Sequence, residues 1–153
     1  MTKIATKAWR MAVVTSRFNA DVTGGLKQGA LKYLQEQGIT VNDAHIFAAP
    51  GAFELPLIAQ TLAKSGKFDG VVCLGCVTKN ETAHFEFVSL GATMGLMQAA
   101  LNTGVPIAFG VLTTYTDEQA KARSRADSNN KGIEAAAAVV ETLETMARIK
   151  ALL

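Results

Sequence analysis

Apolar and polar positions alternate along the chain between two patterns. Short, almost continuous apolar runs are typical of strands, and apolar residues spaced three and four positions apart are typical of helices. Four apolar runs are present, each followed by a helical stretch, at Arg10–Thr15, Ala44–Ala48, Gly70–Val77 and Ile107–Leu112. This order predicts an α/β domain whose parallel sheet lies between layers of helices.

The stretches between the runs carry helix start and stop residues. Asn19 or Asp21 is a candidate N-cap of the first helix, which Gly38 ends, and Thr116 is a candidate cap further along. Further helices are predicted at Phe53–Lys64, Ala83–Asn102 and Lys131–Leu153. Right-handed crossovers would wind these units into a flavodoxin-like, doubly wound three-layer sandwich with a four-stranded parallel sheet, formed by residues 1–153 as one domain.

A sheet of this size has exposed edges. We expect the segment Lys3–Trp9 or a neighbouring subunit to cover one of them, so a homo-oligomer is predicted.

Composition and charge exclude several classes of protein. The chain is 49% hydrophobic and 18% charged, as in a folded domain. Its net charge is only +2 and its basic residues are scattered, which argues against a nucleic-acid partner. No apolar stretch reaches the roughly 18 to 20 residues of a membrane span, and Met1–Arg10 lacks the apolar centre of a secretory signal. A cytoplasmic location is expected.

The two cysteines, Cys73 and Cys76, have the spacing of a redox pair, but that chemistry needs a helix N-terminus. Here they lie in a predicted buried strand, where positions three apart face opposite sides of the sheet. We therefore expect inert core thiols. His45, placed in the second predicted strand, is interpreted as structural.

Function is expected in the loops that leave the strands, because open parallel sheets bind ligands at the carboxyl ends of their strands. These loops supply aromatic rings, a carboxylate, a histidine, a lysine and hydroxyls, which suits a planar polar ligand with an anionic group. They contain no metal-ligand cluster, no Ser-His-Asp spacing and no glycine-rich nucleotide loop. The four loops are Ser16–Asn19, Ala49–Glu54, Thr78–His84 and Thr113–Tyr115.

Several motifs in these places resemble those of the lumazine synthase family. From Trp9 to the C-terminus they are SRFN at 16–19, PGAFELP at 50–56, KNETAHFEFV at 79–88, AFGVLTT at 108–114, EQAKAR at 118–123 and NKGIEAA at 130–136. Each motif alone is weak evidence, but their shared order makes the resemblance specific.

The resemblance implies an enzyme. It would condense 5-amino-6-ribitylamino-uracil with 3,4-dihydroxy-2-butanone 4-phosphate to 6,7-dimethyl-8-ribityllumazine, releasing phosphate and water in the penultimate step of riboflavin biosynthesis. Neither a cofactor nor a metal is implied. The alternative is a non-catalytic homologue that binds a flavin or lumazine or forms a shell. A flavodoxin-type electron carrier is disfavoured, because the loop after the first strand has few hydroxyls.

The resemblance also assigns roles to residues. Phe18 would stack on the pyrimidine, and its place past the strand end argues against burial. Glu54 would accept hydrogen bonds from ribityl hydroxyls. His84 would transfer protons, since histidine both accepts and donates a proton near neutrality. The other implied substrate-binding residues are Ala52, Phe53, Val77, Thr78, Lys79, Phe109 and Lys131.

Phosphate binding would involve Asn80, Glu81, Thr82 and Arg123, through backbone N–H groups at a helix start, a hydroxyl and a bidentate guanidinium. Arg125 is the alternative to Arg123, which is favoured by its position in the motif. Asn80 stands where the family commonly has glycine, and asparagine tolerates the left-handed backbone that such a glycine would supply.

Part of each site would come from an adjacent subunit, since Phe109, Lys131 and Glu134 match family positions at a subunit interface. The family forms pentamers, pairs of pentamers and icosahedral shells of pentamers. The short segment Arg125–Lys131 slightly favours a shell. The resemblance also names riboflavin synthase as a candidate partner protein.

Overall fold

The computed structural model describes residues 8–153 and contains the predicted sheet. All its strands are parallel and lie in the order β2-β1-β3-β4. The chain thus crosses first to one side of β1 and then to the other, which is the flavodoxin-like order and confirms the predicted fold class. The strands are β1 (Met11–Ser16), β2 (Ile46–Ala49), β3 (Gly70–Thr78) and β4 (Ile107–Thr114).

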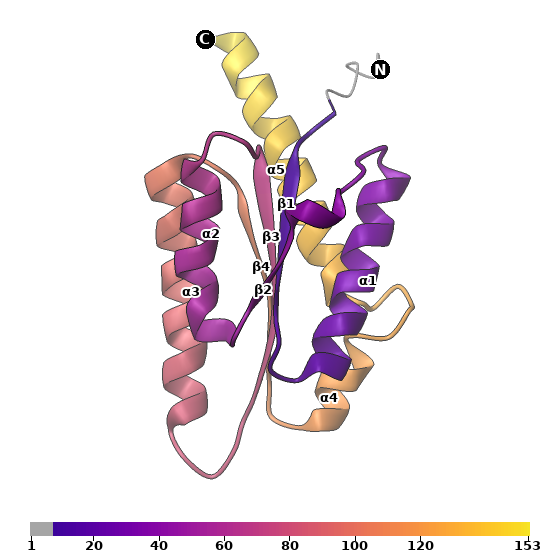
Figure 1. The fold of residues 1–153 in the computed structure, drawn as a ribbon, viewed down its shortest axis with the longest axis vertical. Coiled ribbons are helices and arrows are strands. Elements are labelled where there is room, and N and C mark those ends of the chain that lie inside the picture. The colour runs from indigo at the N-terminus through magenta and orange to yellow at the C-terminus, as the bar shows by residue number, and fades with distance from the viewer. Residues whose placement is uncertain (1–7) are drawn as a thin grey trace.

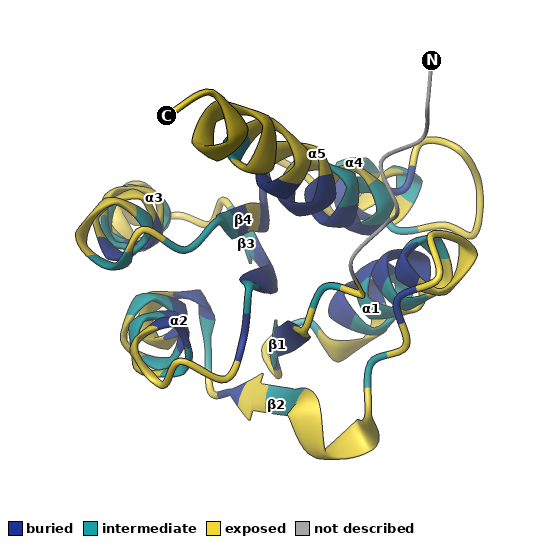
Figure 2. Ribbon diagram, turned by 90° about the horizontal axis from the view of Figure 1, so that it is seen from above, coloured by how far each residue is buried: buried dark blue, intermediate teal, exposed yellow. Residues whose placement is uncertain are grey.

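Helices cover both faces of this sheet (Figure 1). Figure 2 shows α2 and α3 on one face, and α1, α4 and α5 on the other. The helices are α1 (Ala20–Glu36), α2 (Leu55–Lys64), α3 (His84–Thr103), α4 (Asp117–Ala122) and α5 (Lys131–Leu152). Thr116 caps α4 as predicted, because its hydroxyl accepts a hydrogen bond of 3.2 Å from the backbone N–H of Gln119.

The core consists of two apolar clusters, one on each face of the sheet. Leu26 and Leu34 of α1 belong to the first cluster and Leu55 of α2 to the second, all fully buried. Cys76 packs in the first cluster and Cys73 in the second, so the predicted opposite orientation of the two thiols is confirmed.

The second strand begins later than predicted. The side chain of Asn42 accepts a hydrogen bond of 2.9 Å from the backbone N–H of Ala44, and this turn starts the short 3-10 helix Asp43–His45. His45 therefore does not lie in the strand. Its ring stands edge-on to Phe68 at 5.0 Å, near the amino ends of the strands, in keeping with the structural interpretation.

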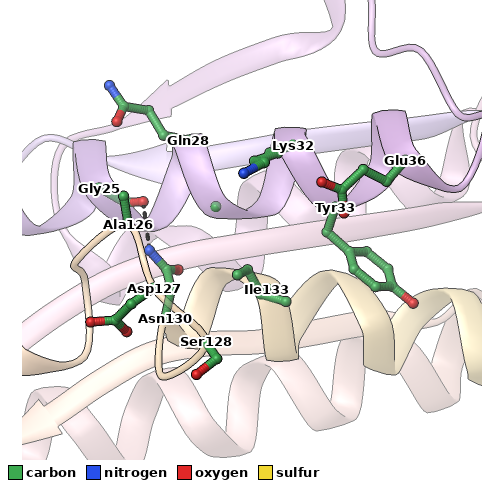
Figure 3. Close-up of a pocket in the computed structure, with 11 residues that line it drawn as sticks. Gly25, Gln28, Lys32, Tyr33, Glu36, Ala126, Asp127, Ser128, Asn130 and Ile133 are labelled. Carbon is green, nitrogen blue, oxygen red and sulfur yellow. Dashed lines mark hydrogen bonds between the residues drawn. The ribbon is translucent and has the colours of Figure 1, made fainter.

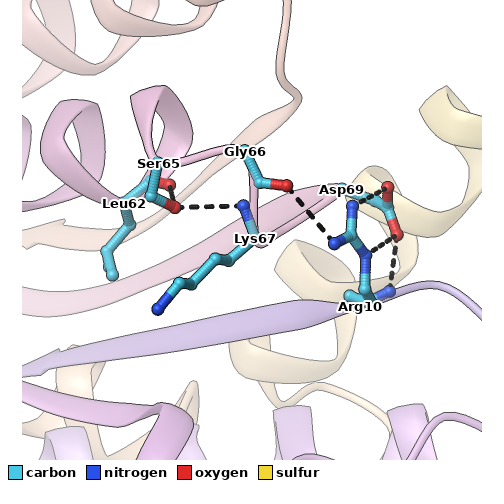
Figure 4. Close-up of polar contacts among 6 residues, drawn as sticks. All are labelled: Arg10, Leu62, Ser65, Gly66, Lys67 and Asp69. Carbon is cyan, nitrogen blue, oxygen red and sulfur yellow. Dashed lines mark hydrogen bonds and ion pairs between the residues drawn. The ribbon is translucent and has the colours of Figure 1, made fainter.

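The amino ends of β1 and β3 are joined by Arg10 and Asp69 (Figure 4). The backbone N–H of Arg10 donates to the Asp69 carboxylate at 2.8 Å, and the guanidinium donates to both carboxylate oxygens and to the carbonyl of Gly66. Because the Arg10 side chain is largely exposed, the ion pair contributes little stability, but it fixes the alignment of the two strand starts.

The expected edge cover is described only at its end. Trp9 packs against the apolar cluster that α1 and α5 form with the sheet. The residues Lys3–Lys7, to which the prediction mainly referred, lie outside the described residues.

Two adjacent glycines of α1 provide a test of the packing between α1 and the segment before α5. A Cβ atom on Gly25 would overlap the carbonyl oxygen of Ser124, whereas one on Gly24 would have nothing within 4 Å. We expect Gly25→Ala to lower the free energy of unfolding by about 1–3 kcal/mol, as overpacking does. Gly24→Ala should raise it by up to about 1 kcal/mol through helix propensity.

Urea unfolding followed by circular dichroism, at one protein concentration for all variants, measures this difference. Equal stabilities of the two alanine variants would contradict the close approach at Gly25.

Candidate functional site

The carboxyl ends of the strands meet at one edge of the sheet, but they do not end level. Ser16 of β1 pairs with Ala49 of β2, both at their strand ends. β3 and β4 continue past β1, and their last pair is Thr78 with Thr114. The loops after β1 and β2 therefore begin closer to the centre of the sheet than the loops after β3 and β4.

Backbone hydrogen bonds connect neighbouring loops on this edge. The N–H of Arg17 donates to the carbonyl of Ala49 at 2.8 Å, which joins the exits of β1 and β2. The N–H of Lys79 donates to the carbonyl of Thr114 at 2.9 Å, which joins the exits of β3 and β4. We define these connected loops, 17–19, 50–54, 79–84 and 115–116, as the loop edge.

Asn19 joins the two halves of the loop edge. Its side-chain amide donates to the carbonyl of Cys76 in β3 at 3.1 Å, across the point where the strand order reverses. Asn19 is the N-cap residue of α1, as predicted, but its side chain bonds to β3 and not to the start of the helix. Its backbone is left-handed, with φ 60°, and its side chain makes no cap hydrogen bond. Asp21, the other candidate, lies inside the first turn of α1.

Aromatic and polar side chains stand exposed on the loop edge. Phe18 is 69% exposed, which confirms that it is not a core residue. Glu54 and His84 are also exposed, while Ala52 is buried in the core. The ring of Phe53 is close to the backbone of α3, since a Cβ on Gly91 would lie 2.8 Å from it.

The loop after β3 places a lysine over the start of α3. The Lys79 ammonium lies 2.5 Å from the Glu86 carboxylate and 5.8 Å from the centroid of the Phe85 ring. The hydrogen bond between them raises the pKa of Lys79 and lowers the pKa of Glu86. Lys79 is therefore a fixed cation with a partner. Val77 and Thr78, at the end of β3, are half-buried.

The turn that follows lacks the predicted left-handed residue, and the helix after it has no side-chain cap at its N-cap position. Among the described residues Asn19 is the only non-glycine residue with positive φ, so the left-handed backbone considered for Asn80 is not adopted. The N-cap of α3 is Ala83, which provides no side-chain acceptor, although the Thr82 hydroxyl accepts a weak hydrogen bond of 3.4 Å from the N–H of His84. The start of this long helix, beside Asn80 and Glu81, therefore has no side-chain acceptor at its N-cap.

Tyr115, in the loop after β4, belongs to the loop edge, although the sequence predicted no role for it. It is 67% exposed, and its ring lies 6.0 Å from that of Phe85. Its backbone N–H donates to the side chain of Gln119 at 2.8 Å, and the carbonyl of Gln119 accepts from the Arg123 guanidinium at 3.0 Å. A chain of contacts thus leads from α3 to Arg123.

The remaining predicted residues lie elsewhere. Arg123 and Lys131 line a cavity of about 400 Å³, to which Arg125 does not contribute. Lys131 makes an ion pair of 2.6 Å with Glu134, another lining residue. Phe109 is 45% exposed on the edge strand β4. None of Phe18, Glu54 and His84 lines this cavity, so one chain brings together only part of the predicted site.

Residues 8–153 contain no group of three or more His, Cys, Asp or Glu side chains that could hold a metal ion. Within the same range, every helix is too short or too polar to cross a membrane.

Comparisons with known proteins settle the family. The sequence model of the 6,7-dimethyl-8-ribityllumazine synthase family matches residues 8–147. The chain belongs to the lumazine synthase family. It is 63% identical to 6,7-dimethyl-8-ribityllumazine synthase 1 of Caulobacter vibrioides over 92% of each chain. It is 48% identical to 6,7-dimethyl-8-ribityllumazine synthase of Nitratidesulfovibrio vulgaris, over 94% of this chain and 92% of the relative. The matches confirm the predicted family and an enzyme of riboflavin biosynthesis.

The two thiols of this lumazine synthase family member are free and buried. Burial raises the pKa of Cys73 to about 12, and it also raises the pKa of Cys76. Since the thiolate is the reactive form, we expect no reaction of the native protein with Ellman's reagent at about pH 8, and two reacting thiols in denaturant. Cys76→Ser should reduce the denatured value to one. Rapid labelling of the native protein would show that the thiols are accessible.

Proposed function

We propose that the chain condenses 5-amino-6-ribitylamino-uracil with 3,4-dihydroxy-2-butanone 4-phosphate to form 6,7-dimethyl-8-ribityllumazine, phosphate and water. The observation that carries this proposal is the loop edge, where an exposed ring, carboxylate and histidine follow three connected strand ends in a chain of this family. The chemistry is imine formation between amine and ketone, loss of phosphate, ring closure and dehydration.

Loop-edge residues would bind the pyrimidine and move protons. Phe18 supports stacking, because its exposed ring follows the end of β1 beside the reversal of strand order. Glu54, exposed after β2 and next to Ala52 and Phe53 in the chain, would accept hydrogen bonds from ribityl hydroxyls. His84, exposed at the start of α3, is the candidate proton-transfer group. Holding amine and ketone together supplies much of the acceleration.

The phosphate of the four-carbon substrate would lie between the start of α3 and the basic pair, Arg123 and Lys131. The N–H groups at the start of α3, beside Asn80, Glu81 and Thr82, favour an anion, and Lys79 lies in the same loop as the partner of Glu86. Arg123 would add the bidentate contact. We prefer it to Arg125 because it lines the cavity that contains Lys131.

A neighbouring subunit would complete each site. In one chain Arg123 and Lys131 line a cavity apart from Phe18 and His84, and Phe109 stands on an open strand edge. These residues would form one site if Phe109, Arg123 and Lys131 of one copy faced the loop edge of the next copy. Such a contact joins two different surfaces of neighbouring copies, so it is a heterologous interface, and it would repeat around a closed ring of subunits.

An exposed apolar stripe on α3 supports this assembly. Five large side chains, between 57% and 76% exposed, follow one another at spacings of three and four residues: Phe87, Leu90, Met94, Met97 and Leu101. This is the spacing of a helix that packs against other helices. Contiguous apolar surface of this kind marks an interface between proteins. We propose a pentamer or a larger assembly built around α3.

A cytoplasmic location and riboflavin synthase as a partner protein stay predictions.

Turnover by the purified protein tests the reaction itself. With both substrates present, we expect lumazine fluorescence and phosphate to appear together and faster than in a protein-free control. Binding of a lumazine without turnover would instead indicate the non-catalytic alternative.

Two variants test the assigned roles within the loop edge. His84→Ala should lower kcat by about a hundredfold with little change in KM. This is the smallest effect typical of losing a positioned proton-transfer group. Phe18→Ala should mainly raise KM for the pyrimidine, because it removes a stacking surface. Equal kcat for the wild-type protein and His84→Ala would remove the proton-transfer role.

Mixed assemblies test whether two subunits share a site. Chains with His84→Ala and chains with Arg123→Ala, co-expressed with different tags and purified through both, contain interfaces where both native residues meet. Random mixing makes about one quarter of the interfaces native, so kcat/KM, measured with both substrates well below their KM, should recover to about that fraction. Mixing His84→Ala with Phe18→Ala is the matched control, because both changes fall in the same half-site and leave no native interface. No recovery in the first mixture would contradict a shared site.

A further inference from the structure

Asn130, the N-cap residue of α5, is a buried polar side chain that contacts more groups than a helix cap requires. It is 2% exposed, and its Oδ1 accepts the cap hydrogen bond of 2.8 Å from the N–H of Gly132. Its Nδ2 also donates to the carbonyls of Gly25 at 3.0 Å, Ser124 at 3.2 Å and Arg125 at 2.8 Å. Figure 3 shows the contact with Gly25 of α1.

The segment that Asn130 holds starts and ends at the two basic residues of the 400 Å³ cavity. The N–H of Lys131 donates to the carbonyl of Arg123 at 2.8 Å, so the chain leaves Arg123 and returns beside it. We call residues 124–130 the basic-pair loop. Asn130 binds two carbonyls inside this loop and one outside it, in α1.

Close packing fixes the Asn130 amide in place. A Cβ on Gly29 of α1 would overlap the amide, and a Cβ on Gly132 would overlap the carbonyl of Leu26. The amide is therefore enclosed by α1 on one side and the basic-pair loop on the other. Because α1 starts directly after Phe18, this contact connects the basic pair to the helix that follows the aromatic loop.

The loop also separates the basic cavity from a second one, of about 390 Å³, drawn in Figure 3. That cavity has Lys32 and Tyr33 of α1 opposite Asp127 and Ser128, a mixture that indicates no particular ligand. The cavity on the other side of the loop is lined by Arg123, Lys131 and Glu134, and Lys131 is paired with Glu134. The group there that suits an anion is therefore the Arg123 guanidinium.

We propose that Asn130 is a positioning residue: its amide holds the basic-pair loop against α1 so that Arg123, beside the Lys131–Glu134 ion pair, presents its charge to a phosphate group. The identity of the anion rests on the proposed function. Asn130 itself does not contact the phosphate.

Asn130→Asp separates this role from helix capping. Aspartate keeps the shape and the cap acceptor, but it puts an oxygen where three carbonyl oxygens need a donor. We expect the dissociation constant of inorganic phosphate, measured by calorimetry, and KM for the phosphorylated ketone each to rise about tenfold, as misplacement of binding groups does. KM for the pyrimidine should stay within about twofold.

Asn42→Asp is the matched control, since Asn42 caps a short helix through the same kind of Oδ1 contact, at the amino end of β2. It should leave phosphate binding unchanged. Gly29→Ala is a second route, because its Cβ would displace the Asn130 amide without removing a polar group. It too should weaken phosphate binding, which keeps the test usable where Asn130→Asp folds poorly.

A double-mutant cycle identifies the residue through which Asn130 acts. In an Arg123→Ala background, Asn130→Asp should cost less than about twofold in phosphate affinity. An undiminished tenfold loss in that background would overturn action through Arg123, and native phosphate affinity in both Asn130→Asp and Gly29→Ala would overturn the proposal entirely. Phosphate binding is measured without turnover, so absence of turnover in the wild-type protein would reject the enzyme reaction and leave this result interpretable.

Discussion

Parallel strand pairing directs every strand exit of this protein to one edge, and hydrogen bonds between the exits turn that edge into a connected surface. Of these contacts, the one from Asn19 to the carbonyl of Cys76 spans the reversal of strand order. Without it, the loop that carries Phe18 would be joined only to the exit of β2 through Arg17. The geometry of a binding surface thus depends on a few backbone groups that the sheet leaves unpaired at its end.

The proposed assembly would supply what this surface lacks. A flat heterocycle and a phosphate need binding groups on more than one side, and the loop edge of one chain provides one side. The basic pair and Phe109 lie away from it, while α3 exposes a regular apolar stripe. The proposed assembly would account for both features, because neighbouring subunits would cover the apolar stripe on α3 and complete the site. The family to which the chain belongs makes lumazine formation the reaction that such a site would perform.

The sequence predicted the parts of the fold that depend on local patterns. The continuous apolar run at Gly70–Val77 is the central strand, to within one residue, because only a strand covered on both faces has such a run. Side-chain hydrogen bonds produced the errors. The side chain of Asn42 stabilises a turn where the sequence predicted the start of a strand. The Asn19 amide binds the distant carbonyl of Cys76 and not the start of its own helix. Neither choice of partner is visible in the local sequence.

The sequence predicted which loops carry the candidate site residues better than it predicted the contacts that these residues make. The exposure of Phe18 follows from its place after a strand, but the pairing of Lys79 with Glu86 and the contacts of Asn130 depend on the folded chain. The spacing of apolar residues on α3 is visible in the sequence, but which of them stay exposed depends on the packing of α3 in the folded chain. Arrangement between subunits cannot follow from the pattern of one chain.

The most direct measurement is a structure of the assembled protein, by crystallography or electron microscopy, with a ribityl-pyrimidine and inorganic phosphate bound. The account predicts the pyrimidine on Phe18 near His84 of one subunit, and the phosphate between the start of that subunit's α3 and Arg123 of its neighbour. Ligands bound entirely within one chain, or Phe18 and His84 on surfaces with no common cavity in the assembly, would contradict it.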